Sequence, residues 1–186
     1  YHQKPEETSA VFREIEGVSW FCTGDVGRLV GGPGGQSFLK ITDRKKELLK
    51  TSGGKYVAPA PIESKLKESF LVEQAMVVGE QRKFVSVLII PAFDTLRDWC
   101  RRHQVEWTDT DQVIRHPKVQ DKYQEIIDEI NPGFSHTEQI KKFRLINADW
   151  APSKSDGTTA ELTPTLKLKR RVIMDKHAGE IEALYQ

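Results

Sequence analysis

Short apolar runs and helical apolar spacing divide the middle of the chain into recognisable elements. Residues 74–79 and 84–91 are almost continuously apolar and are separated by a charged turn, which is typical of two buried strands that pair with each other. Residues 119–130 place apolar side chains three and four positions apart, and Asn-Pro-Gly follows directly. This spacing predicts an amphipathic helix that ends before the proline.

Weaker patterns predict further elements on both sides of this centre. Residues 1–13 are expected to form a polar helix that Gly17 ends, and residues 20–23 a short apolar strand. The remaining expected elements are, in order, a hairpin over residues 26–41, a short hairpin over 48–57, a helix that 59–63 leads into and that runs to about Ser69, a helix capped by Asp94 and reaching His103, a short helix at 111–114, a strand over 143–146, a polar loop over 151–161 and a closing helix over 172–185. Because strands and helices are mixed without strict alternation, the predicted fold class is α+β.

The composition is that of a globular protein without a membrane span. The chain has 186 residues, of which 38% are hydrophobic and 30% charged, enough for one domain or for one domain and a piece of another. No apolar run approaches the roughly 20 residues of a membrane span, and the first ten residues lack the apolar core of a secretion signal. Cys22 and Cys100 are expected to be free thiols in a reducing compartment. The expected location is cytoplasmic, with association at a membrane surface left open.

Basic residues gather in two separate stretches, residues 40–55 and 167–176, of a chain whose net charge is only +1. Such clusters indicate local anion binding, and the alternative is two charged faces in solvent. No aromatic residue interleaves with the basic run 167–171, which argues against a nucleic acid as partner. The histidines and cysteines show no ligand spacing, so no metal site is predicted within the chain.

Asp25 stands at a Gly-Asp turn directly after the predicted apolar strand. A carboxylate held at a tight turn after a buried strand can accept hydrogen bonds from a diol such as a ribose. Its alternative role is that of a turn residue that bonds to its own backbone. The glycine-rich stretch Gly31–Gly35 lacks the Lys-Ser/Thr of a phosphate-binding loop and opens no helix, so we interpret it as a hairpin tip.

Four segments carry motifs in a characteristic order. They are WFCTGD at Trp20–Asp25, ITDRKKE at Ile41–Glu47, the stretch from TSGGK to PIE at Thr51–Glu63, and ELTPTLKLKR at Glu161–Arg170. Together they resemble successive motifs of the AMP-forming adenylating enzymes, the superfamily of acyl-CoA synthetases, luciferases and peptide-synthetase adenylation domains. The last segment is similar to the form found in long-chain fatty-acyl-CoA synthetases. The four motifs span nearly the whole chain.

The resemblance implies a domain organisation. Family members begin with a large N-terminal domain that carries a Thr/Ser/Gly-rich phosphate loop and the acyl pocket, and no such loop occurs in this sequence. Residues 1–42 are therefore expected to be the tail of the large adenylating domain, a β-hairpin remnant. Residues 43–186 are expected to form a small mobile C-terminal domain, a short β-sheet flanked by helices, with a hinge at Asp43.

Residue by residue, the resemblance implies nucleotide contacts and a moving joint. Asp25 matches the carboxylate that holds the ribose hydroxyls of AMP, and Arg44 matches the arginine that approaches the ribose or phosphate. Asp43 matches the residue about which the small domain rotates between two half-reactions. These three positions are the expected nucleotide site and hinge.

The resemblance also implies groups for the reacting atoms. Gly53 and Gly54 match the loop that lines the pantetheine channel, and Lys55 is expected to meet the phosphate or CoA. Lys169 aligns with the catalytic lysine that bridges the acyl carboxylate and the α-phosphate, where an ammonium reduces the repulsion between two anions. Lys167-Leu168 replaces the Ser-Gly that often precedes this lysine, so Lys167 remains a rival.

The implied function is that of a long-chain fatty-acid–CoA ligase, which converts ATP, fatty acid and CoA into acyl-CoA, AMP and pyrophosphate through an acyl-adenylate. Mg²⁺ on the ATP phosphates and the enzyme's own N-terminal domain are the further expected partners. The 186-residue chain alone is expected to be inactive, because it has neither the phosphate loop nor the acyl pocket. The alternatives are another acyl- or aryl-CoA ligase of the superfamily and a non-enzymatic binding module derived from the small domain.

Overall fold

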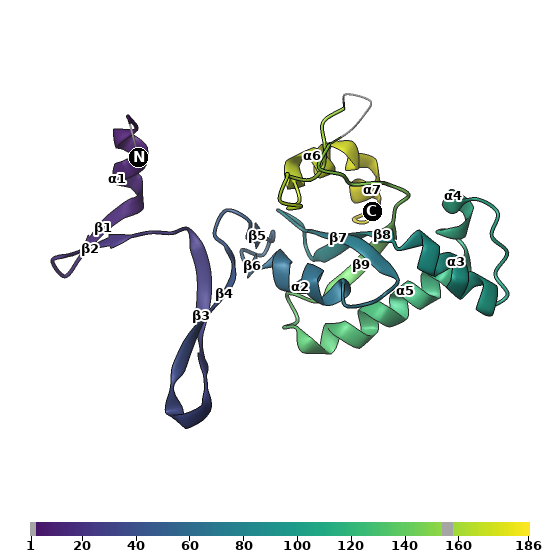
Figure 1. The fold of residues 1–186 in the computed structure, drawn as a ribbon, viewed down its shortest axis with the longest axis horizontal. Coiled ribbons are helices and arrows are strands. Elements are labelled where there is room, and N and C mark those ends of the chain that lie inside the picture. The colour runs from purple at the N-terminus through teal and green to yellow at the C-terminus, as the bar shows by residue number, and fades with distance from the viewer. Residues whose placement is uncertain (1–2, 154–157) are drawn as a thin grey trace. The chain divides into compact units, whose positions relative to one another are not determined.

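A computed structural model describes residues 3–153 and 158–186. The chain divides into two compact units, Tyr1–Leu48 and Leu49–Gln186 (Figure 1). The class is α+β, as predicted: small antiparallel sheets in the first unit, and a three-stranded sheet with helices in the second. None of the described helices is both long and apolar enough to cross a membrane.

The first unit consists of one helix and two hairpins. Its elements are α1 (Pro5–Val11), β1 (Phe12–Ile15), β2 (Val18–Phe21), β3 (Asp25–Gly31), the 3-10 turn η1 (Pro33–Gly35) and β4 (Ser37–Arg44). β1 pairs with β2 and β3 pairs with β4, each antiparallel, in two separate sheets. The predicted hairpin with a glycine-rich tip is therefore confirmed.

The expected helix over residues 1–13 is wrong at its C-terminal end, and its first two residues lie outside the described part. The helix stops at Val11, and Phe12 begins a strand that pairs with Phe21. Glu16 and Gly17 have φ of 52° and 75°, the positive values that a two-residue hairpin turn demands at both positions. Gly17 thus turns a hairpin instead of ending a helix.

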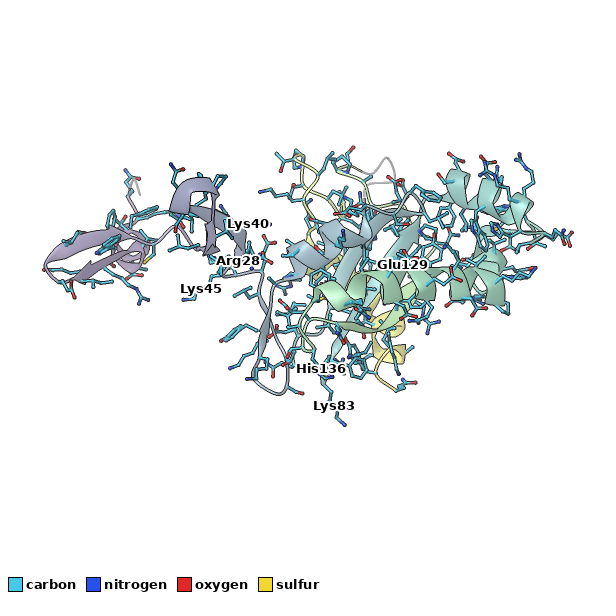
Figure 2. All side chains as sticks on the ribbon, turned by 90° about the horizontal axis from the view of Figure 1, so that it is seen from below. Arg28, Lys40, Lys45, Lys83, Glu129 and His136 are labelled. Carbon is cyan, nitrogen blue, oxygen red and sulfur yellow. The ribbon has the colours of Figure 1, made fainter. Side chains whose placement is uncertain are left out.

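The apolar strand before Asp25 is not buried. Trp20 and Phe21 in β2 are 56% and 53% exposed, so the interpretation of Asp25 as a turn after a buried strand is wrong in that respect. Among the side chains described in residues 3–48, only Asp43 is buried. The basic residues Arg28, Lys40 and Lys45 are exposed as well (Figure 2).

The second unit holds a mixed sheet of three strands with helices on both faces. Its elements are β5 (Leu49–Lys50), β6 (Tyr56–Val57), α2 (Pro59–Leu66), β7 (Val72–Val78), β8 (Val85–Pro91), α3 (Phe93–Arg102), α4 (Thr110–Val113), α5 (Pro117–Ile130), η2 (Asn131–Gly133), β9 (Ile140–Leu145), α6 (Arg170–Lys176) and α7 (Ala178–Ala183). In the sheet, β8 lies between β7, which is antiparallel to it, and β9, which is parallel. A parallel neighbour requires a crossover connection, which α3 to α5 provide.

Strand alternation divides the core of this unit into two layers. One face of the central strands contributes Val87 and Ile89 to a cluster with α2, α3 and α5. The other face contributes Leu88 and Ile90 to a cluster with α6 and α7. Figure 1 shows the same arrangement, with α2 and α5 on one side of the sheet and α6 and α7 on the other. A strand covered on both faces has apolar residues at nearly every position, and the sequence of residues 84–91 shows this pattern.

Several boundaries differ from the expected ones; α2, for example, ends at Leu66, before Ser69. Ala92 is the N-cap of α3, and Asp94 lies inside the first turn, where a carboxylate still favours the helix dipole. The strand β9 begins at Ile140, three residues early. The closing helix is broken at His177, whose φ of −112° and ψ of 28° are not helical, and so forms α6 and α7.

Candidate functional site

Asp25 and Arg44 are brought together by the β3–β4 hairpin. Asp25 opens β3, Arg44 closes β4, and the two are direct partners across the pair. Arg44 Nε lies 3.3 Å from Asp25 Oδ1, with side chains 64% and 30% exposed. Among the described residues the Asp25 carboxylate has no other partner. Acceptor capacity therefore remains on the carboxylate and donors remain on the guanidinium, a combination suited to a ribose or a phosphate.

Asp43 is buried near the end of β4. Its Oδ1 accepts a hydrogen bond from the backbone N–H of Arg44 at 2.7 Å. The β3–β4 register pairs Val26 with Asp43 and Gly27 with Ile41, so Thr42 is an extra, bulged residue. A bulge bends a strand. Asp43 thus directly follows a local irregularity of the hairpin.

The Gly53–Lys55 segment is the turn of the β5–β6 hairpin. Thr51 and Lys55 close the turn, with the Thr51 N–H donating to the Lys55 carbonyl oxygen at 2.9 Å and the Lys55 N–H to Thr51 Oγ1 at 3.2 Å. Gly54 has φ of 76°, where a side chain would be strained, whereas Gly53 has ordinary backbone and open space for a Cβ. The Ser52 N–H donates to the Arg82 carbonyl oxygen at 2.9 Å and ties the loop to the β7–β8 turn.

Lys169 stands at the base of a small hairpin-like loop. The loop is closed by the Lys169 N–H donating to the Glu161 carbonyl oxygen at 2.7 Å and by the isolated bridge between Leu162 and Leu168. Lys169 is also the N-cap of α6, and its carbonyl oxygen accepts from the Ile173 N–H at 3.1 Å. The backbone of Lys169 is therefore held on both sides.

Lys167 and Lys169 differ in their surroundings. Lys167 lies beside the turn of the loop and is exposed, whereas Lys169 is half-buried at the base. Among the described residues, neither ammonium has a hydrogen bond or an ion pair with another side chain. By contrast Lys176 Nζ is bound to Glu161 Oε1 at 2.7 Å and to the Thr159 carbonyl oxygen at 2.6 Å. Both candidate lysines are thus available to an anion, and Lys169 has the more rigid backbone.

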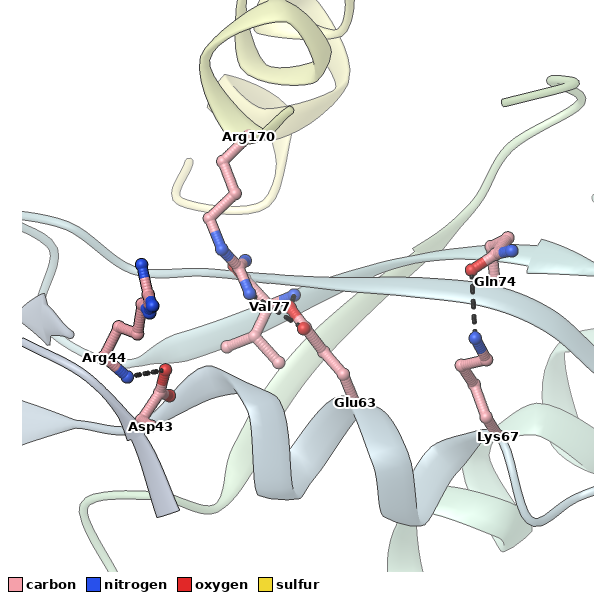
Figure 3. Close-up of polar contacts among 7 residues, drawn as sticks. All are labelled: Asp43, Arg44, Glu63, Lys67, Gln74, Val77 and Arg170. Atoms are coloured by element: carbon pink, nitrogen blue, oxygen red, sulfur yellow. Dashed lines mark hydrogen bonds and ion pairs between the residues drawn. The ribbon is translucent and has the colours of Figure 1, made fainter. Parts of the chain in front are cut away.

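A buried ion pair lies next to Lys169 and was not predicted. Arg170 donates to Glu63 Oε2 at 2.8 Å, and Glu63 Oε1 accepts from the Val77 N–H at 2.8 Å (Figure 3). Glu63 shares the buried face of α2 with three apolar residues, Pro59, Ile62 and Leu66. A carboxylate inside an apolar helical stripe is the sequence signal that predicts such a partner.

The predicted site residues fall into two groups, one in each unit. Asp25, Arg44 and Asp43 belong to the first unit, and the Gly53–Lys55 turn and Lys169 belong to the second. Within the second unit, α2 follows the glycine turn and holds the residue after Lys169 through Glu63. In the described part of the chain, no group of three or more His, Cys, Asp or Glu side chains could hold a metal ion.

Comparison with known proteins identifies similar sequences along the whole chain. Residues 46–186 match the family described as the AMP-binding enzyme C-terminal domain. The long-chain-fatty-acid–CoA ligase FadD15 of Mycobacterium tuberculosis is 34% identical over 186 residues, which are 100% of this chain and 29% of that protein. The long-chain-fatty-acid–CoA ligase ACSBG1 of Homo sapiens is 34% identical over 190 residues, covering 92% of this chain and 25% of that protein. The chain thus spans less than a third of the length of these relatives.

Two solved structures with the same fold contain adenylation domains. The adenylation domain of a carboxylate reductase from Mycobacterium chelonae superposes with a TM-score of 0.68 at 26% identity. The match covers 100% of this chain and 25% of the reductase chain. An adenylation–carrier didomain of a carboxylic acid reductase from Segniliparus rugosus, in complex with AMP, has the same score and identity and is covered to 23%. With the four motifs and the fold in agreement, the chain belongs to the AMP-binding enzyme C-terminal domain family.

Proposed function

We propose that the chain acts as the C-terminal domain, with a tail of the large domain, of an AMP-forming long-chain fatty-acid–CoA ligase. The reaction joins fatty acid and ATP into an acyl-adenylate with release of pyrophosphate, and CoA then displaces AMP to give the thioester. The observation that carries this proposal is the 34% identity to a long-chain ligase over all 186 residues, including the four ordered motifs.

Lys169 is the proposed catalytic group of the first half-reaction. Attack of a carboxylate on the α-phosphate brings two anions together, and a fixed ammonium between them stabilises the charged transition state. Lys169 is half-buried, its backbone is held on both sides, and its ammonium has no partner among residues 3–153 and 158–186, all of which support this role. Lys167 has an unpaired ammonium too, but it lies beside the exposed turn.

Asp25 and Arg44 are the proposed contacts to the nucleotide. The carboxylate accepts the ribose hydroxyls, and the guanidinium orients the carboxylate and donates to the ribose or phosphate. Their 3.3 Å contact, on the partly exposed end of a hairpin, fits such a site. ATP would bring Mg²⁺ on its phosphates, and both would be held mainly by the large domain.

The second half-reaction is assigned to the Gly53–Lys55 turn. A turn without side chains at two positions allows a narrow thiol-bearing arm to pass close to backbone. Lys55 is exposed at the same turn and offers a cation to the phosphates of CoA. Asp43, beside the bulge at Thr42, is the proposed hinge between the two half-reactions.

Exposed apolar side chains of the first unit support the proposal that a large domain packs against it. Phe12, Trp20, Leu29, Phe38 and Leu39 are each between 48% and 72% exposed. Apolar surface of this size normally marks a contact with another protein surface. The large adenylating domain is the occupant that we propose, because the first unit directly precedes residues 46–186, which match the C-terminal domain family.

Two substitutions test the function. In the protein together with its large adenylating domain, Lys169→Ala is expected to slow adenylate formation about a hundredfold or more, the loss seen when one transition-state contact is removed. Lys167→Ala is the matched control and is expected to leave the rate nearly unchanged. Adenylate formation is measured as ATP–pyrophosphate exchange with a panel of fatty and aryl acids, which also separates the long-chain assignment from other ligases. A Lys169→Ala protein with full exchange activity would contradict the proposal.

A further inference from the structure

The ion pair between Glu63 and Arg170 closes a small ring of polar contacts on the edge strand β7. Arg170 donates to Glu63 Oε2 at 2.8 Å and to the Val77 carbonyl oxygen at 3.3 Å. Glu63 in turn accepts from the Val77 N–H at 2.8 Å. The two side chains are only 17% and 11% exposed and come from positions 107 residues apart. The ring thereby holds together Val77 of β7, Glu63 of α2 and Arg170, the first residue of α6 (Figure 3).

The ring adds a side-chain anchor at the start of α6 to the backbone hydrogen bond between Lys169 and Glu161. Its N-cap, Lys169, makes no side-chain capping hydrogen bond. A helix end without a cap frays unless another contact fixes it. Arg170, the first residue of the helix, provides that contact through its guanidinium. The Cα of Lys169 is therefore fixed relative to α2 and β7 by its neighbour's side chain.

The ring also neutralises one of the two buried carboxylates in the segments that adjoin Lys169. Two buried carboxylates lie in the segments that hold the lysine loop, Glu63 at 8% and Glu161 at 5% residue exposure. Glu63 is bound by Arg170, and Glu161 is bound by Lys176. Each buried carboxylate thus has a cation of its own, and the ammonium of Lys169 makes no ion pair in the described part of the chain. A free ammonium can bind a substrate anion without first breaking an internal pair.

We propose that Arg170, held by Glu63, is a positioning residue for Lys169 in adenylate formation. The role rests on the proposed function. Arg170 is not proposed to touch a reacting atom. It fixes the backbone of the neighbouring Lys169, and its guanidinium neutralises the Glu63 carboxylate. Because a small displacement of a catalytic group is costly, loss of this contact should act on the step that uses Lys169 and spare the step that does not.

The test compares the two half-reactions in the protein with its large adenylating domain. Arg170→Met keeps the aliphatic stem and removes the cation, and is expected to slow adenylate formation roughly 10- to 100-fold. Thioester formation from supplied acyl-adenylate and CoA should stay within about twofold, since Lys169 plays no part in that step. Arg171→Met is the matched control: the same change at the next position, on an exposed side chain without a partner among the described residues.

A double variant separates positioning from simple loss of folding. Arg170→Met alone removes the cation that the buried Glu63 carboxylate binds, which destabilises the fold. Glu63→Gln/Arg170→Met removes both charges, so its melting temperature should recover. Adenylate formation should nevertheless remain low, because the start of α6 still lacks its side-chain anchor to α2 and β7. Recovery of adenylate formation in the double variant, or equal losses in both half-reactions, would overturn the positioning role.

Lys169→Ala, measured in parallel, separates this inference from the proposed function. If Lys169→Ala keeps full exchange activity, the catalytic role proposed for Lys169 fails and the positioning role fails with it. If Lys169→Ala loses activity while the Arg170→Met protein behaves like Arg171→Met, only the positioning role is overturned. Loss in both Lys169→Ala and Arg170→Met, confined to adenylate formation, supports both.

Discussion

Tyr123 is the residue on which the packing of the second unit can be tested most directly. It is fully buried on α5, and its hydroxyl donates to the carbonyl oxygen of Leu71 at 2.6 Å. Burial raises the pKa of this phenol well above its usual range, and the nearby Cys100 raises it further. The neutral hydroxyl is therefore part of the folded state, as a second donor to the Leu71 carbonyl oxygen, which also accepts from the Ala92 N–H at 2.9 Å.

We expect Tyr123→Phe to lower the free energy of unfolding by about 0.5–1.5 kcal/mol, because the Leu71 carbonyl oxygen keeps the Ala92 N–H but loses its second donor. The pH dependence has a definite sign. A pKa that is higher in the folded than in the unfolded state gives stability that is complete below the unfolded value of about 10 and is lost above it. Denaturant unfolding at pH 8 and pH 11 should therefore show a smaller alkaline loss in Tyr123→Phe than in the unaltered protein. The exposed Tyr56, changed to Phe, is the control; equal alkaline losses in all three would contradict the assignment.

At the scale of elements, the end of β4 contains the proposed hinge. The small domain would rotate there between the orientations used in the two half-reactions. Asp43 follows the bulge at Thr42 and holds the N–H of Arg44 with its own carboxylate. If this point is the hinge, Asp43→Pro should slow thioester formation more than adenylate formation, because a fixed φ obstructs rotation while the adenylating pose persists.

A second substitution in the same strand controls for damage to the hairpin. Ile41→Pro places the same ring in β4 on the other side of the bulge, opposite Gly27. It should weaken the β3–β4 pairing and lower both half-reactions together. If Asp43→Pro also lowers both rates by one common factor, Asp43 is a structural residue of the strand and not a hinge.

At the scale of the whole molecule, we expect the 186-residue chain alone to form no acyl-adenylate. It carries Lys169, but no Thr/Ser/Gly-rich phosphate loop occurs in its sequence. Without a site that holds ATP and the carboxylate together, one correctly placed lysine provides no proximity. Pyrophosphate release from ATP and palmitate should equal that of the same chain carrying Lys169→Ala. Turnover clearly above that background would show that the chain has a complete site of its own.

Local patterns were sufficient for much of this protein. The runs 74–79 and 84–91 indicated buried strands, because a strand with helices on both faces has apolar residues at every position. The spacing of apolar residues before Asn131 indicated α5, because a helix that covers a core repeats its apolar side chains every three to four residues. The four motifs indicated the family, since each keeps its chemistry within a few consecutive residues.

The misjudged elements are those in which neighbours in space outweigh local preference. The local pattern predicts a helix as far as Arg13, but Phe12–Ile15 form a strand, because the partner strand Val18–Phe21 supplies the hydrogen bonds. The closing helix is broken at His177, and no proline or glycine stands at that position to indicate the break. The cap of α3 was placed two residues late, since Ala92 makes no side-chain capping bond that a sequence could reveal.

The sequence by itself determined the family, the candidate groups Asp25, Arg44 and Lys169, and the strand and helix content of the second unit. Only the tertiary structure decided that β9 lies parallel to β8 and that Arg170 binds Glu63. The physical reason is range: a motif or an amphipathic face is written in adjacent residues, whereas a contact between positions 107 apart depends on how the core packs the segments between them. The sequence therefore identifies Lys169 as a candidate, but only the folded structure shows the contacts that fix its backbone.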